Sequence, residues 1–133
     1  MAAPSTGPFR SWEGVGFTEI HDGVHLRSIG GEQVLLCEVK YDPGKQVRRH
    51  AHDQTEQVMI IAEGDVTMTI GDEAKRLTAG DVVVVNRGIE HELYSEHGVR
   101  FFEALAPVPL DHVPDRERDL VLGPDGGVTH VER

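Results

Sequence analysis

The sequence has little cysteine and no long apolar segment. Cys37 is the single cysteine among 133 residues, so no disulfide can form within the chain. No apolar run approaches the roughly 20 residues that span a bilayer, and residues 1–8 lack the apolar core of a secretion signal. These absences predict a protein of the reducing cytoplasm that does not bind membranes.

Positive charge is also scarce. The chain carries 23 Asp and Glu against 13 Lys and Arg, which gives a formal net charge of -10. A surface of this sign repels phosphate backbones, so we expect no nucleic-acid partner. An anionic small-molecule substrate is not excluded, because a metal ion or a buried arginine can reverse the potential inside a pocket.

Helical periodicity is missing, and short stretches rich in Val, Ile and Thr take its place. They recur about every eight to twelve residues, which is typical of an all-β sandwich or barrel. Gly, Asp and Pro separate them at positions that accept turn dihedral angles. We expect strands at residues 15–20, 23–29, 33–41, 47–52, 57–62, 66–70, 82–86, 91–95 and 99–106.

A chain of this length has room for one hydrophobic core. The expected strands place a single barrel at residues 15–107, after an N-terminal segment at residues 1–14. Residues 108–133 are polar and rich in Pro and Gly, which predicts a polar C-terminal tail. The short apolar stretch 120–122 either pins this tail against the barrel or belongs to a partly disordered terminus.

Three histidines give the strongest chemical signal. His50 and His52 are two residues apart, so on one strand both imidazoles point to the same face. His91 follows a second strand-turn-strand unit. Three neutral imidazoles with an amide or carboxylate oxygen form a typical site for a borderline metal, with positions left open for water or substrate. The pattern predicts one divalent metal ion (Zn, Ni, Mn or Fe) as cofactor.

Two motifs surround these histidines, and both resemble the motifs of the cupin superfamily. The first has the family spacing at Gly44, His50, His52, Gln57 and Gly64. The second has it at Gly80, Gly88 and His91, whereas Asn86 replaces a proline and Ser95 the final asparagine. The resemblance covers about residues 20–107. It implies a single-domain cupin, a double-stranded β-helix or jelly-roll barrel.

The oxygen ligand is either Glu56 or Gln57, since the two are adjacent and the family tolerates either spacing after the second histidine. Six residues separate Gln57 from Gly64, as the motif requires, and adjacent strand residues cannot both face inward. We therefore predict a metal site of His50, His52, Gln57 and His91. Without a carboxylate among its ligands the ion stays a strong Lewis acid, which favours non-redox chemistry.

Three further residues are candidates for proton transfer or for substrate binding. Glu103 lies on an otherwise apolar stretch, where a carboxylate is costly to bury without a purpose, so it is the candidate catalytic residue for proton transfer. Arg48 shares strand parity with His50, and Arg27 lies on an early strand. Both are candidate substrate-binding residues for a carboxylate or enolate oxygen. An outward, solvated position is the alternative for each of the three.

The ligand set is similar to that of compact monocupins that linearise unsaturated uronates and of cupins that cyclise polyketides. Uronate enzymes carry an acid and an aromatic residue in alternation before a proline, and here Glu103 matches but Leu105 lacks the ring. The resemblance implies a metal-dependent isomerase, lyase or cyclase for a small oxygen-rich substrate. An Fe(II)-dependent dioxygenase and a non-catalytic binding cupin are the alternatives.

Residues 82–85 are four consecutive valines, so this strand is apolar on both faces. Both faces have to be covered, and small cupins often pair their barrels by sheet extension. We therefore expect a homodimer.

Overall fold

The computed structural model describes residues 7–107, 120–122 and 128–130. Its regular elements in these residues are all strands, which confirms the all-β prediction. No helix in the described part of the chain is long and apolar enough to cross a membrane. The strands are β1 (Thr18–His21), β2 (Val24–Gly30), β3 (Leu35–Tyr41), β4 (Lys45–His50), β5 (Glu56–Ile70), β6 (Glu73–Thr78), β7 (Val82–Val85), β8 (His91–Ser95), β9 (Val99–Ala106), β10 (Leu120–Leu122) and β11 (Val128–His130).

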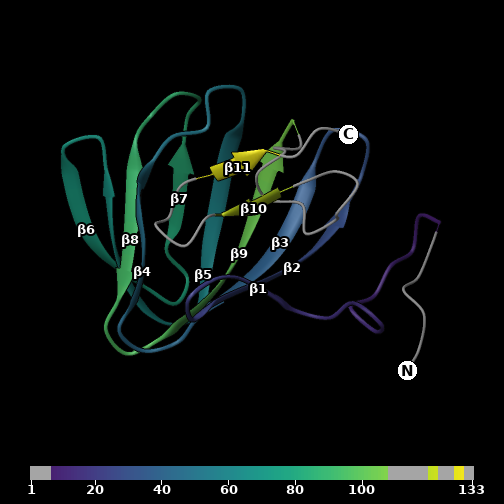
Figure 1. The fold of residues 1–133 in the computed structure, drawn as a ribbon, viewed down its shortest axis with the longest axis horizontal. Helices are drawn as coiled ribbons and strands as arrows, with labels where there is room; N and C mark the ends of the chain where they lie inside the picture. Colours follow the sequence, from purple (N-terminus) through teal and green to yellow (C-terminus); the bar gives the residue numbers. More distant parts are fainter. Residues whose placement is uncertain (1–6, 108–119, 123–127, 131–133) are drawn as a thin grey trace.

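Nine strands form one antiparallel sheet that curls around a common interior as a jelly-roll barrel (Figure 1). The strand order is β1-β2-β3-β9-β5-β8-β4, and β6 and β7 each pair with a different half of β5. Strands β10 and β11 form a separate antiparallel pair. Most of the predicted tail lies outside the described residues, apart from these two strands.

Strand β5 is continuous where the sequence predicts two strands with a turn at residues 63–65. Gly64 has φ +80°, and the register with β9 shifts between Ile61 and Glu63. The strand is irregular here without ending, so its first half pairs with β7 and β9 and its second half with β6 and β8. Strand β6 was not predicted, because its sequence is polar and buries only Leu77.

The two motif glycines Gly44 and Gly64 provide a matched test of this geometry. Both have φ +80°, but a Cβ on Gly64 would lie 2.2 Å from the Gly98 carbonyl oxygen, whereas one on Gly44 would meet nothing within 4 Å. We expect Gly44→Ala to lower the free energy of unfolding by about 1 kcal/mol and Gly64→Ala by about 3 kcal/mol or more, because backbone strain and a backbone clash add. Urea unfolding of both variants measures the difference, and equal losses would contradict it.

The core consists of the inward-facing residues that alternate with exposed ones along the strands, such as Leu26, Val39, Met59, Met68 and Phe101. Ser95, which stands where the family motif has asparagine, is fully buried at the end of β8. Its hydroxyl donates to the Asp65 carbonyl at 2.6 Å and accepts from the Gly98 amide at 2.9 Å. The serine thus ties the end of β8 to the irregular part of β5, so the departure from the motif keeps the strand end hydrogen-bonded.

Candidate metal centre

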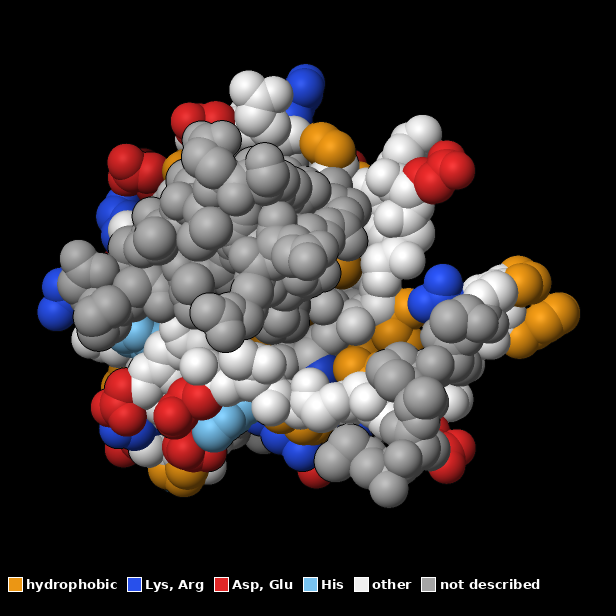
Figure 2. All heavy atoms as spheres, turned by 45° about the vertical axis from the view of Figure 1, so that its right-hand side comes forward, with side chains coloured by type: hydrophobic (Ala, Val, Ile, Leu, Met, Phe, Trp, Pro, Cys, Tyr) orange, Lys and Arg blue, Asp and Glu red, His pale blue; other side chains and the backbone are white. Residues whose placement is uncertain are grey.

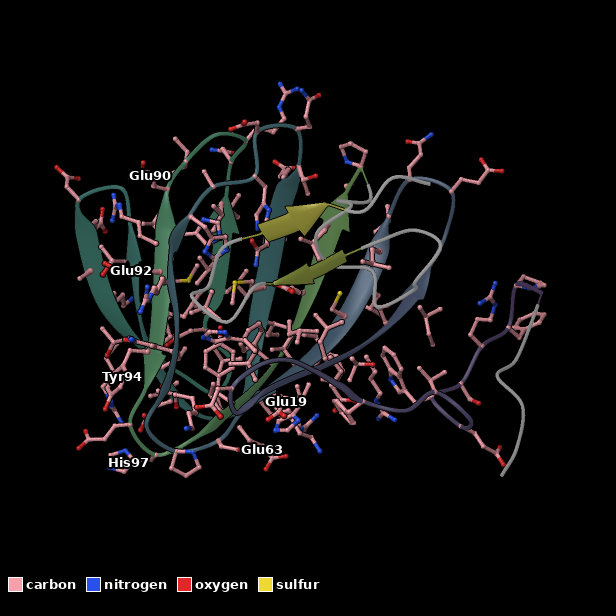
Figure 3. All side chains as sticks on the ribbon, viewed as in Figure 1. Glu19, Glu63, Glu90, Glu92, Tyr94 and His97 are labelled. Atoms are coloured by element: carbon pink, nitrogen blue, oxygen red, sulfur yellow. The ribbon has the colours of Figure 1, made fainter. Side chains whose placement is uncertain are left out.

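The three motif histidines meet at one end of the barrel. His50 is the last residue of β4 and His91 the first residue of β8, and the two are paired across the sheet. Potential ligand nitrogens of His50, His52 and His91 all lie within 4.8 Å of one another. On β8 the labelled Glu92 and Tyr94 point away from the barrel (Figure 3), so alternation turns His91 inward.

His52 reaches this cluster from a loop, and the expectation of a strand through residue 52 is wrong. Strand β4 ends at His50. The Gly88 amide donates to the His52 carbonyl at 2.9 Å, which fastens the loop after β4 to the turn before β8. The second motif therefore positions His52 as well as His91.

Two imidazoles carry their ring protons on the nitrogen that faces the backbone. His50 Nδ1 lies 2.6 Å from the Arg48 carbonyl oxygen, and His91 Nδ1 lies 3.0 Å from the Ile89 carbonyl oxygen. A carbonyl only accepts, so each Nδ1 donates and each Nε2 keeps its lone pair. Metal-binding histidines are oriented in the same way by a hydrogen bond at their second nitrogen. The cluster therefore fits a divalent metal ion.

Gln57 on β5 and Glu103 on the adjacent strand β9 lie side by side in the wall of the same cavity, and both are 3% exposed. Gln57 Nε2 donates a hydrogen bond to Glu103 Oε2. Gln57 Oε1 is buried and has no hydrogen-bond partner among the described residues, so it is available to a metal ion. Glu56 is exposed on the other face of β5. Strand parity thus places the amide, and not the adjacent carboxylate, beside the imidazoles.

The remaining wall of the cavity is apolar. The volume of the cavity is about 20 Å³, which is room for a water molecule. The lining residues besides the polar groups are Ile20, Val24, Leu26, Val39, Val47, Leu93 and Phe101. No Lys or Arg belongs to the lining in the described part of the chain. Beside the candidate ligands, Glu103 and Tyr41, the wall of this small cavity is therefore apolar.

Tyr41 is a cavity residue that the sequence analysis missed. It is buried on β3, lines the cavity and packs its ring against Phe101. Burial, and to a lesser degree the Glu103 carboxylate, raise the pKa of the Tyr41 phenol well above its usual value. The phenol therefore stays protonated and can donate a hydrogen bond to a bound oxygen. Its strand parity with Cys37 and Val39 was the signal that could have found it.

Arg48 lies outside the cavity, so the expectation of an inward side chain is wrong. The register between β4 and β8 shifts between Val47 and His50, and Arg48 and Arg49 are both exposed. Arg49 pairs with Glu90 at 2.6 Å on the outer surface. A bulge places two consecutive residues outside before His50 turns in, which simple parity does not anticipate.

Arg27 also faces away from the cavity, on the outer side of β2. Its guanidinium lies 2.6 Å from Glu38 Oε1 and donates to the Val15 carbonyl at 3.2 Å. The rings of Trp12 and Phe17 cover it at 4.8 and 4.6 Å. Arg27 therefore holds the N-terminal segment against the sheet. Strand β1 begins at Thr18 and not at residue 15 as expected.

The comparisons with known families agree with this geometry. The cupin domain model matches residues 37–104, which is about half of the chain. The matched segment contains all three histidines of the cluster. This chain belongs to the cupin domain family. No protein with a curated description matches it.

Solved structures of several cupins share the fold. KdgF from Halomonas sp. is 20% identical with a TM-score of 0.71, over 77% of this chain and 96% of that one. An RmlC-like cupin from Shewanella frigidimarina is 22% identical with a TM-score of 0.72, over 77% and 93%. A predicted oxalate decarboxylase from Thermotoga maritima is 17% identical with a TM-score of 0.61, over 71% and 92%. At these identities the likeness shows the fold alone.

Proposed function

We propose that this protein is a metal-dependent enzyme that catalyses a non-redox isomerisation, cyclisation or elimination on a small oxygen-rich substrate. The observation that carries the proposal is Glu103, a buried carboxylate that accepts a hydrogen bond from Gln57 beside the three histidines. A divalent ion held by His50, His52, Gln57 and His91 would polarise a substrate carbonyl or hydroxyl oxygen.

Glu103 is the group that moves the proton. Its carboxylate lines the cavity, and the Gln57 amide holds it in place from one side. A carboxylate in an otherwise apolar wall costs free energy, and proton transfer at a substrate carbon or oxygen is a reason to keep it there. Tyr41, which lines the same cavity, donates a hydrogen bond from its hydroxyl to a second substrate oxygen.

The cavity wall narrows the choice of substrate. No arginine or lysine lines the cavity in the described residues, so a substrate carboxylate finds no cationic side chain there. This weighs against a uronate and favours a substrate whose adjacent oxygens face the metal site and whose remainder is apolar.

Two measurements test the proposed reaction. The metal-loaded protein is incubated with an unsaturated uronate and with a linear polyketone, and product mass and oxygen uptake are recorded. We expect a product of unchanged mass, or one that has lost water, without oxygen uptake. Oxygen uptake with bound iron would replace the proposal by an Fe(II)-dependent dioxygenase, and a bound but unaltered substrate would replace it by a binding cupin.

Gln57→Glu tests the role of the neutral ligand. A carboxylate binds a borderline cation at least as well as an amide, so we expect metal content to be retained. Turnover is expected to fall at least 10-fold, because the new charge weakens the Lewis acid and the residue no longer donates a hydrogen bond to Glu103. Metal stoichiometry and turnover are measured together.

Glu56→Gln is the matched control, because Glu56 is adjacent and exposed. It is expected to change neither metal content nor turnover. If Glu56→Gln removed the metal while Gln57→Glu had no effect, the carboxylate would be the ligand and the Lewis-acid argument would be wrong.

A further inference from the structure

His50 has less backbone support than its partner histidine His91. It is the last residue of β4, which pairs only with β8 among the described strands. The pairing is interrupted between Val47 and His50, where two residues of β4 stand opposite one residue of β8. This is a β-bulge. His91, by contrast, is paired on both sides, with His50 and with Ile70 of β5. The position of His50 therefore depends on what holds the bulge.

The bulge also supplies the hydrogen-bond acceptor that orients the His50 ring. The carbonyl of Arg48, the first residue of the bulge, accepts from His50 Nδ1 at 2.6 Å. In a neutral imidazole either nitrogen can carry the proton, and this hydrogen bond selects Nδ1. The lone pair of Nε2 is then free for a metal ion. A bulge that shifted would lose this selection.

Arg49, the second residue of the bulge, is tied to two other segments of the chain. Its Nε donates to Glu90 Oε2 at 2.6 Å, and its Nη2 donates to the Gly71 carbonyl at 2.6 Å. The Gly71 amide in turn donates to the Glu90 carbonyl at 2.8 Å. Glu90 directly precedes His91 and is labelled at that end of β8 in Figure 3. One guanidinium thus joins the bulge to the β5–β6 turn and to the residue before His91.

This network differs from an ordinary ion pair on the surface. Charged side chains of both signs are interspersed over the face shown in Figure 2, and isolated exposed pairs of this kind contribute little to stability. Arg49 instead uses the planar fork of its guanidinium on two acceptors, which a lysine cannot reproduce. The neighbouring Arg48 is also exposed, and its side chain has no hydrogen bond or ion pair with the described residues. The two arginines therefore differ in their contacts and not in their charge.

We propose that Arg49 is a positioning residue of the metal centre, which holds the bulge so that the His50 ring presents Nε2 to the ion. Arg49 precedes His50, Glu90 precedes His91, and the two histidines are paired across the strands. The contact on the outside of the barrel therefore fixes the same two segments whose imidazoles meet inside. The proposal rests on the metal site of the proposed function, but not on the reaction.

The first test uses metal-free protein and nuclear magnetic resonance of the ring nitrogens, at a pH where the imidazoles are neutral. We expect the Nδ1–H tautomer of His50 in the wild type and in Arg48→Ala. In Arg49→Ala and Arg49→Lys we expect a mixture of the two tautomers, while His91 keeps its proton on Nδ1 in every protein. Circular dichroism checks the fold of each variant. An unchanged His50 tautomer in folded Arg49→Ala would overturn the proposal.

The second test is titration of the same proteins with zinc in the presence of a competing chelator. We expect the zinc dissociation constant to rise about 10-fold in Arg49→Ala and Arg49→Lys. In Arg48→Ala we expect it to be unchanged or lower, because removing a positive charge near the ion favours binding. Charge alone would shift both alanine variants in the same direction.

Equal zinc affinities of Arg48→Ala and Arg49→Ala would overturn the positioning role alone. A wild type that binds no divalent metal would overturn the proposed function and this proposal with it.

Discussion

Glu103→Gln is expected to lower turnover by about 10²- to 10⁴-fold while the protein keeps its metal and its fold. The substituted amide has nearly the shape of the carboxylate, and its oxygen can still accept the hydrogen bond from Gln57 Nε2. It cannot take up a proton at neutral pH, so only proton transfer is lost. Steady-state kinetics on metal-loaded protein, with metal content measured on the same sample, gives the effect.

Glu38→Gln is the control for a buried carboxylate without a role in the reaction. Glu38 is 5% exposed on β3 and faces the outer side, where it pairs with Arg27 and Arg100. We expect a loss of about 1–3 kcal/mol in the free energy of unfolding with unchanged turnover per folded molecule. Wild-type turnover of Glu103→Gln would contradict the catalytic assignment, and an equal loss of turnover in Glu38→Gln would show that the effect is general.

His91→Ala is expected to abolish stoichiometric metal binding. The ring is 1% exposed and lies within 4.8 Å of the other two histidines, so its loss removes one of three imidazole ligands from the cluster. The barrel should still fold, with a loss of roughly 1–3 kcal/mol, because the apolar core cluster does not include His91. Metal analysis after dialysis measures the first effect and urea unfolding the second.

A stability measurement separates metal binding from activity in the same variant. Metal at 1,000 times its dissociation constant raises the free energy of unfolding of a binding protein by about 4 kcal/mol. We expect this gain for the wild type and for His97→Ala, whose histidine is exposed and pairs with Asp65. His91→Ala should show none of it. Metal-dependent stabilisation of His91→Ala equal to that of the wild type would remove this histidine from the ligand set.

Local strand geometry explains what the sequence predicted correctly about the cavity. The motif spacing to Gly64 selected Gln57 as the inward residue, and alternation along the strand then placed Glu56 outside, as the structure has them. The apolar stretch around Glu103 made it a candidate buried acid, and the structure buries it on β9. The spacing of the two motifs correctly predicted that the three histidines lie close together.

The arginines show where local reasoning stops. Arg48 has the right parity for the cavity, but a register shift in its pairing with β8 places it outside. Arg27 is held outside by Glu38 on the neighbouring strand and by two aromatic rings of the N-terminal segment. Both outcomes depend on contacts between strands that the sequence around each arginine does not contain.

The sequence by itself determined the fold family, the histidine cluster and the faces on which Gln57 and Glu56 lie, because motif spacing and a period of two are properties of the chain alone. Only the tertiary structure decided which of these residues meet. It brought Gln57, Glu103 and Tyr41 together in one cavity, and it carried β5 through Gly64 without a break. These arrangements follow from strand order and register, which many residues fix together through the packing of the whole barrel.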